Sequence, residues 1–201
     1  MVAKNQSETR PVQTERVWLR AWLIGGSLSL LACAHLCTAS NRYAQGSQPG
    51  NQVKAAYLVN FLKFVEWSEY AFADPLAPVV IWVVGNDPFG FSPQQITLGK
   101  TVQERDVIVR RYHAGEDLRG SHILFISASE QKRLPEILSG LRGSSVLTVA
   151  DMDRSLEAGG MIQFSLEETR VRFTINPNST NQTKLKLSSK LLSVARVAKG
   201  N

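Results

Sequence analysis

The sequence predicts an α/β fold, a layered domain with a mostly parallel (mixed) sheet flanked by helices and a C-terminal hairpin and helix. Three observations carry this prediction. An unbroken apolar run at residues 79–84 has the length and β-branched content of a strand buried on both faces, as in parallel sheets. Strand and helix patterns alternate along most of the chain. Near the end, two strand patterns follow each other closely enough to predict a hairpin.

The first forty residues have the pattern of an export signal. Residues 1–20 are polar and net positive, residues 21–37 are uncharged and mostly apolar, and small residues follow as far as Ala39. We therefore predict a signal peptide over residues 1–39. Two alternatives stay open. The apolar run could remain as a membrane anchor, or Cys33, in a segment that resembles a bacterial lipobox, could become a lipidated first residue.

A linker separates this segment from the domain. Residues 40–51 are polar and contain Gly and Pro, which predicts a flexible connection to a domain at residues 52–198. Both cysteines, Cys33 and Cys37, precede the linker, so the domain has none. Thiol catalysis and cysteine–zinc sites are excluded from it, and its fold must be stable without disulfides.

Charge is unevenly distributed along the chain. Lys and Arg number 23 against 17 Asp and Glu, and every charged residue from Arg170 onward is basic. This basic segment is either a solvated surface or a patch for an anionic partner or membrane. No aromatic residue follows Phe173, so the stacking platform of a single-strand binder is absent there and no nucleic-acid partner is expected.

The first predicted element of the domain is an amphipathic helix over residues 52–66. Apolar residues recur along it with helical spacing. Four aromatic residues crowd this segment and its end. Core packing explains them, and a dimer face is the alternative because interface cores are rich in aromatics. They are Tyr57, Phe61, Phe64 and Trp67.

The middle of the domain predicts strands at residues 79–84, 107–112, 123–127 and 145–149. A helix over 129–141 should follow the third strand, opened by a capping box of Ser127 and Glu130. The inner face of this helix is predicted to hold four aliphatic residues: Leu134, Ile137, Leu138 and Leu141.

The end of the domain predicts a hairpin and a helix. Strand patterns occupy residues 161–166 and 169–175, and a helix is expected over 183–198. Gly159 and Gly160 stand just before the hairpin, where glycine permits a positive φ or a close backbone approach. They form either a turn or a binding edge that also includes Glu157 and Ile162.

Nucleotide chemistry is not expected at the loop after the first strand. Gly85 and Gly90 have the spacing of a phosphate-binding loop. Phe91 and Ser92 stand where such a loop needs Lys and Ser or Thr, so the phosphate charge has no counterpart. The loop is predicted to be a turn.

Other residues that enzymes use occur without their partners. Ser129 and Lys132 match an S-x-x-K pattern, but the further motifs of serine–lysine hydrolases are missing, and Ser129 is expected to cap a helix. His113 and His122 belong to no metal-ligand motif. We expect a protein without enzymatic activity, with no catalytic residues, no metal and no cofactor.

Several landmarks occur in an order that resembles the YfiR family of bacterial periplasmic regulators. The resemblance spans residues 52–198, and its pieces are specific only in combination. They are the helix at 53–67, the Gly and Asp-Pro-Phe-Gly at 85–90, the strands at 122–126 and 147–149, the Gly-Gly-Met-Ile at 159–162, the Val-Arg-Phe at 171–173 with Asn176, and the closing segment at 185–192.

The resemblance implies a periplasmic location, a domain that often forms homodimers, and a regulatory rather than enzymatic role. The best-known member restrains an inner-membrane diguanylate cyclase, which lowers cyclic di-GMP and disfavours biofilm. We therefore expect an exported regulator that binds such a cyclase or a similar receptor. A periplasmic small-molecule-binding protein, with an unidentified ligand at the C-terminal strand ends, is the alternative. The candidate partner-binding or ligand-binding residues are Glu157, Gly159, Gly160, Ile162, Arg172 and Asn176.

Overall fold

The computed structural model describes residues 49–90, 97 and 99–198. The chain divides into two units, Met1–Gly46 and Ser47–Asn201, and every described residue lies in the second. The predicted signal peptide, Cys33 and most of the predicted linker lie outside the described residues, as do Phe91 and Ser92. Among the described helices, none has the length and apolar character needed to span a membrane.

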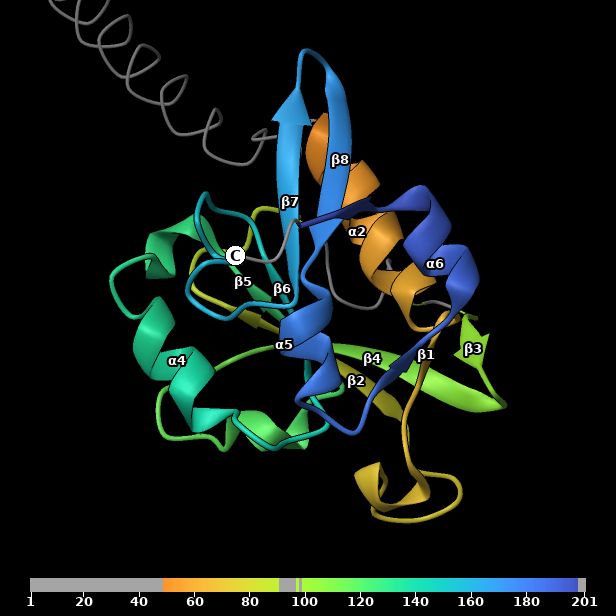
Figure 1. Ribbon diagram of the computed structural model, residues 1–201. Coiled ribbons are helices and arrows are strands. Elements are labelled where there is room, and N and C mark those ends of the chain that lie inside the picture. The colour runs from red at the N-terminus through yellow and green to blue at the C-terminus, as the bar shows by residue number, and fades with distance from the viewer. Residues whose placement is uncertain (1–48, 91–96, 98, 199–201) are drawn as a thin grey trace, which may run out of the picture. The chain divides into compact units, whose positions relative to one another are not determined.

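An eight-stranded mixed sheet forms the centre of the domain and confirms the predicted fold class (Figure 1). In spatial order the strands are β10 (Arg196–Val197), β8 (Arg170–Ile175), β7 (Ile162–Glu167), β6 (Leu147–Ala150), β5 (Ile123–Ile126), β2 (Val79–Val84), β4 (Arg105–Arg111) and β3 (Thr101–Val102). The four pairings between β4 and β7 are parallel, whereas β8 is antiparallel to β7 and β3 is antiparallel to β4. Two-residue strands form both edges.

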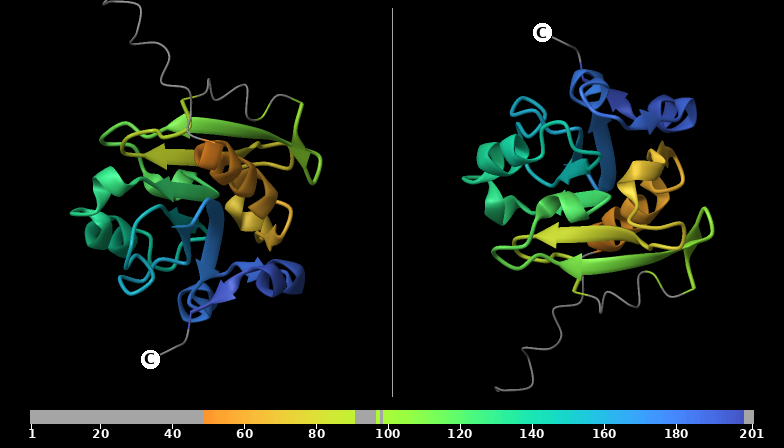
Figure 2. Two further views of the ribbon diagram at one scale, coloured as in Figure 1. Left: turned by 90° about the horizontal axis from the view of Figure 1, so that it is seen from above. Right: turned by 90° about the horizontal axis from the view of Figure 1, so that it is seen from below.

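Helices cover the two faces of this sheet unequally. On one face α2 (Pro49–Phe61) and α6 (Ser189–Val194) pack into the larger apolar core. On the other face α4 (Leu134–Gly140) packs over β2, β5 and β6, and the smaller core there contains no residue of β7 or β8. Seen from above, α2 and α4 lie on opposite sides of the sheet (Figure 2).

The central parallel strands are buried on both faces, as their sequences predict. All four residues of β5 are inaccessible to solvent, and they alternate between the two cores. Ile123 and Phe125 face the α2 side, while Leu124 and Ile126 face α4. Uninterrupted apolar sequence is what burial on two faces requires.

The hairpin of β7 and β8 behaves differently, because only one of its faces is covered. Phe164 and Phe173 pair across the strands and pack against α2. The opposite face carries polar side chains, including Ser165 and Arg172, which also pair across the strands. The tip of the hairpin projects beyond the other strands (Figure 1).

The first helix is shorter than predicted. It ends at Phe61 rather than at residue 66, and Val65–Glu66 forms a strand, β1, paired antiparallel with Lys186–Leu187, β9. Phe64 and Trp67 therefore follow the helix instead of lying on it. Pairing with a distant part of the chain overrides the helical pattern, and a short apolar pattern fits both structures.

The predicted C-terminal helix over residues 183–198 is also largely replaced. A short helix, α5 (Pro177–Asn181), precedes β9, and only the six residues of α6 are helical after it. The Ser188 hydroxyl accepts the Leu191 N–H and opens α6. The flanking segments pair as β9 and β10 instead of continuing the helix.

The helix after β5 is interrupted near its start. A 3₁₀ turn, η4 (Ala128–Glu130), precedes α4, and Ser127 makes no side-chain capping bond, so the capping-box prediction is wrong. The Ser129 hydroxyl accepts the Asn86 N–H instead of capping a helix. The predicted inner face is confirmed, because all four of its aliphatic residues are buried: Leu134, Ile137, Leu138 and Leu141.

Candidate partner-binding surface

Of the two glycines before the hairpin, Gly159 has a positive φ and Gly160 lies close to another part of the backbone. Gly159 has a φ of +101°. Gly160 donates its N–H to the Ser155 carbonyl at 2.9 Å, and a Cβ on it would lie 2.8 Å from that oxygen. A turn with a close backbone approach is therefore present at this point, as one of the two predicted interpretations requires.

Asn176 connects the end of β8 to this turn. Its Oδ1 accepts the N–H groups of Asn178 and Ser179, which opens α5, and its Nδ2 donates to the Leu156 carbonyl at 3.1 Å. Its own N–H donates to the Met161 carbonyl. These bonds occupy the polar atoms of the Asn176 side chain within the chain and fix the base of the hairpin.

The structure brings five of the six candidate residues together and separates the sixth. Glu157, Gly159, Gly160, Ile162 and Asn176 all lie at the hairpin base. Of these, Ile162 and Gly160 are buried, and Glu157 is exposed and paired with Arg154 at 2.9 Å. Arg172 stands farther along the hairpin, opposite Ser165, with its side chain exposed.

The uncovered side of the hairpin forms a basic surface, which we call the hairpin face. It consists of Gln163, Ser165, Glu167, Arg170, Arg172 and Thr174, whose side chains share one side of the two strands. Arg170 and Arg172 are exposed and make no ion pair within the part of the chain that the structure describes. The adjacent Arg196 pairs with Glu167. Free guanidinium groups on a rigid sheet suit the recognition of an acidic protein segment.

Sequence reasoning missed Arg170 and Arg196 as neighbours of Arg172. The spacing of Arg170 and Arg172, two residues apart in a strand pattern, was the available signal, because such residues share a face. Nothing in the local sequence places Arg196 there. The parallel pairing of β10 with β8 does so, setting Arg196 beside Thr174.

The aromatic residues of the first helix and its end pack within the chain. The Phe61 ring contacts those of Phe164 and Phe173, with centroids 6.0 and 5.1 Å apart, and the Tyr57 ring lies 5.2 Å from Phe173. Trp67 donates its indole N–H to the Ser145 carbonyl. The aromatic cluster holds α2 to the inner side of the hairpin.

Polar groups at the C-terminal strand ends satisfy one another. Gly85 has a φ of +85°, as a turn after β2 requires, and Asp87 pairs with Arg111 at 2.8 Å. Lys54 of α2 donates to both carboxylate oxygens of Asp151 at 2.7 Å. The carboxylates of Asp87 and Asp151 thus each have a basic partner within the chain.

A hollow of about 480 Å³ lies between α4, the turn before β7 and the segment after α5. Its lining mixes aliphatic side chains such as Leu138 and Met161 with hydroxyls such as Ser179 and Thr183. Arg142 is its one charged lining residue. The size and mixed lining suit a small organic molecule.

The two histidines of the domain have opposite surroundings. The side chain of His113 is largely exposed, whereas only 6% of His122 is accessible, and its Nδ1 accepts the Val80 N–H at 3.1 Å. Burial lowers the pKa of His122 to about 4. The backbone of Ala71 acts in the opposite direction, and the charge of Arg105 adds to the lowering. The ring is therefore neutral at ordinary pH.

Among the described residues, no cluster of His, Cys, Asp and Glu could hold a metal ion.

Comparison with known proteins identifies the family. Residues 51–196 match the family model described as YfiR/HmsC-like, which covers almost the whole described domain. The chain therefore belongs to this family, and the resemblance noted from its sequence is confirmed. No curated protein matches the chain.

Proposed function

We propose that this YfiR/HmsC-like protein is an exported, non-enzymatic regulator that binds an inner-membrane signalling protein and restrains it. The receptor we propose is a diguanylate cyclase, so that the regulator lowers cyclic di-GMP. The observation that carries the proposal is the family match over residues 51–196. At the C-terminal strand ends the polar groups bond to each other, which supports a binding role over a catalytic one at that place.

The hairpin face is the surface through which we propose the receptor is bound. It is rigid, because the other side of the hairpin packs on α2 through Phe164 and Phe173. Arg170 and Arg172 extend from it without internal partners among the described residues. Binding an acidic segment there would pair these guanidinium groups without breaking an existing ion pair.

Deletion of the gene tests the function. Cyclic di-GMP, measured by mass spectrometry in cell extracts, should rise in the deletion strain and return to its original level when the full chain is supplied. An unchanged level in the deletion strain, with no receptor found by crosslinking in the envelope, would reject the proposal.

Charge reversal tests the surface. Arg170→Glu with Arg172→Glu should fail to restore the low cyclic di-GMP level, because the like charges would repel an acidic receptor segment. Lys184→Glu with Lys190→Glu makes the same change in charge on exposed residues away from the hairpin and should restore it. Equal restoration by both variants would remove the hairpin face from the proposal.

The hollow beside α4 favours small-molecule binding as the second candidate function. A compound that fits it would raise the melting temperature of the purified protein, and Arg142→Ala should abolish that rise for an anionic compound. A melting temperature that no compound in a metabolite panel shifts would count against this alternative.

A further inference from the structure

Two large side chains on one loop are almost fully exposed to solvent. Tyr70 is 97% accessible and Leu76 is 86% accessible, and both belong to the loop at residues 68–77 between β1 and β2. A single exposed apolar residue needs no explanation. Two such residues on one short loop keep a large apolar area in water. No other large hydrophobic residue among those described is as exposed as either of them.

The inner side of the 68–77 loop is held firmly in place. The Phe72 ring stacks on His122 with centroids 4.6 Å apart, and the Arg105 guanidinium lies 3.9 Å from the centre of the Phe72 ring. Arg105 also donates to the carbonyls of Asp74 and Ala77 at 3.1 and 2.8 Å. The loop thus packs one aromatic residue, Phe72, inward against the core and presents another, Tyr70, outward.

The backbone of the loop is also defined by its own turns. The Phe72 N–H donates to the Glu69 carbonyl, and the Leu76 N–H donates to the Asp74 carboxylate at 2.8 Å. A partner that covers Tyr70 and Leu76 would therefore find both residues on an ordered support. Little backbone entropy would be lost on binding, which favours affinity.

The charge of the loop indicates what kind of surface it fits. Within residues 67–78 the charged side chains are those of Glu69 and Asp74. Arg105 contacts the loop from its inner side, but it donates to backbone carbonyls and not to these carboxylates. Anionic lipid headgroups would repel these carboxylates. Two copies meeting through the same loop would bring like charges together. An apolar recess rimmed by basic residues would complement both the side chains and the charge.

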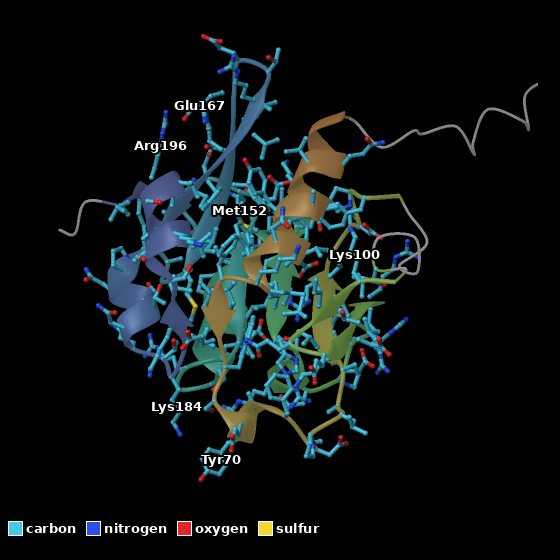
Figure 3. All side chains as sticks on the ribbon, turned by 90° about the vertical axis from the view of Figure 1, so that its right-hand side faces the viewer. Tyr70, Lys100, Met152, Glu167, Lys184 and Arg196 are labelled. Carbon is cyan, nitrogen blue, oxygen red and sulfur yellow. The ribbon has the colours of Figure 1, made fainter. Side chains whose placement is uncertain are left out.

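We propose that the 68–77 loop is a second protein-docking surface, which inserts Tyr70 and Leu76 into an apolar recess of a partner protein rimmed by Lys or Arg. Tyr70 projects at the opposite end of the domain from Glu167 near the hairpin tip (Figure 3). The loop and the hairpin face can therefore be occupied at the same time. This inference goes beyond the proposed regulation of a cyclase and does not depend on it.

Crosslinking in living cells tests the occupant. The full chain is produced with a photo-crosslinking amino acid in place of Tyr70 and, as a matched control, in place of Val194, another exposed apolar residue. The expected result is a crosslink from position 70, absent from position 194, to one envelope protein at a peptide with apolar residues flanked by Lys or Arg. Crosslinks only to lipid, or to a second copy of this chain, would overturn the proposal.

Affinity for the crosslinked protein, once purified, tests the contribution of the loop. Tyr70→Ala with Leu76→Ala should weaken binding at least about tenfold, because a tyrosine seated in a pocket of the partner often carries a large share of the binding energy. Glu69→Lys should also weaken it, more strongly at low salt, while Val194→Ala should leave it unchanged. All four substitutions are at exposed positions, so melting temperatures should agree. Unchanged affinity in the loop variants would overturn the proposal even if the cyclic di-GMP experiment succeeds.

Discussion

The two halves of the sheet, the parallel strands and the hairpin, differ in how many of their faces are covered by helices. In the parallel half, from β4 to β6, helices cover both faces of the central strands. In the hairpin half, one face packs on α2 and the other meets solvent. The chain marks the difference directly, because β5 reads ILFI with every residue buried, whereas β8 reads RVRFTI and alternates.

The comparison separates residues that make the fold from residues that remain available for binding. A side chain on the α4 side of β5 has no access to solvent, so its identity is dictated by packing. A side chain on the same side of β7 or β8 is not covered by a helix, so packing leaves its identity open. Among the strands of the sheet, a binding surface is therefore expected on the hairpin half.

The largest expected effect compares one residue from each half on the same side of the sheet. Leu124→Ala, in β5, removes a fully buried side chain from the core under α4. It should lower the free energy of unfolding by about 3 kcal/mol through lost burial and the cavity left behind. Urea unfolding followed by circular dichroism measures the change.

Ser165→Ala, in β7, is the matched control for that experiment. Its side chain lies on the uncovered side of the hairpin, so the free energy of unfolding should change by less than about 0.5 kcal/mol. Similar losses in the two variants would show that the hairpin side is covered in solution, and the comparison would fail.

The parallel half could be predicted from the sequence because its signals are local. An unbroken β-branched run such as 79–84 admits few alternatives, and β2 has those bounds in the structure. The predicted strand at 107–112 is found at Arg105–Arg111, and the one at 145–149 is found at Leu147–Ala150. Burial on two faces constrains every residue of such a strand, so each of them carries information.

The segments that were predicted wrongly are those whose structure depends on distant pairing. Val65 fits a helical stripe, yet it pairs with Leu187 in β1 and β9. Arg196 fits a helix face, yet it lies in β10 beside Thr174. The periodicity of a short segment does not depend on residues far away in the sequence, so it cannot reveal that such a segment pairs with a distant strand. Val65 and Leu187 are more than a hundred residues apart, and the sequence pattern around Val65 therefore predicted a helix.

The candidate site could be predicted only in part for the same reason. The glycines were predicted from the hairpin pattern and Asn176 from the family resemblance, and the structure joins them at the hairpin base. The grouping of Arg170, Arg172 and Arg196 requires β10 to be in place. The exposure of Tyr70 and Leu76 was not predicted, because apolar residues in a sequence indicate burial by default.

The next effect extends the comparison to the N-terminal end of β5, where His122 is buried just before the first residue of the strand. Because burial depresses its pKa to about 4, the unfolded chain takes up a proton below about pH 6.5 that the folded chain refuses until about pH 4. This residue therefore lowers the free energy of unfolding by about 3 kcal/mol as pH falls through that window. Urea unfolding at about pH 7 and about pH 4.5 measures the slope.

Two variants separate the contribution of His122 to the pH dependence of stability from that of the carboxylates, which also take up protons at acidic pH. His122→Asn removes the titration while offering an oxygen to the Val80 N–H, so the pH slope should become shallower. His113→Gln removes an exposed histidine and should leave the slope as it is. A slope that His122→Asn does not change would mean that water reaches the N-terminal end of β5.

The smallest expected effect concerns the turn at the base of the hairpin, where two neighbouring glycines differ in the space around them. Gly160→Ala would place a Cβ 2.8 Å from the Ser155 carbonyl oxygen, which is backbone and cannot move freely. The free energy of unfolding should fall by about 2 kcal/mol. Gly159→Ala meets open space and suffers only the strain of its positive φ, so about 1 kcal/mol is expected. Thermal melts of both variants compare them, and an equal or smaller loss for Gly160→Ala would show that the turn relaxes to accommodate the added methyl group.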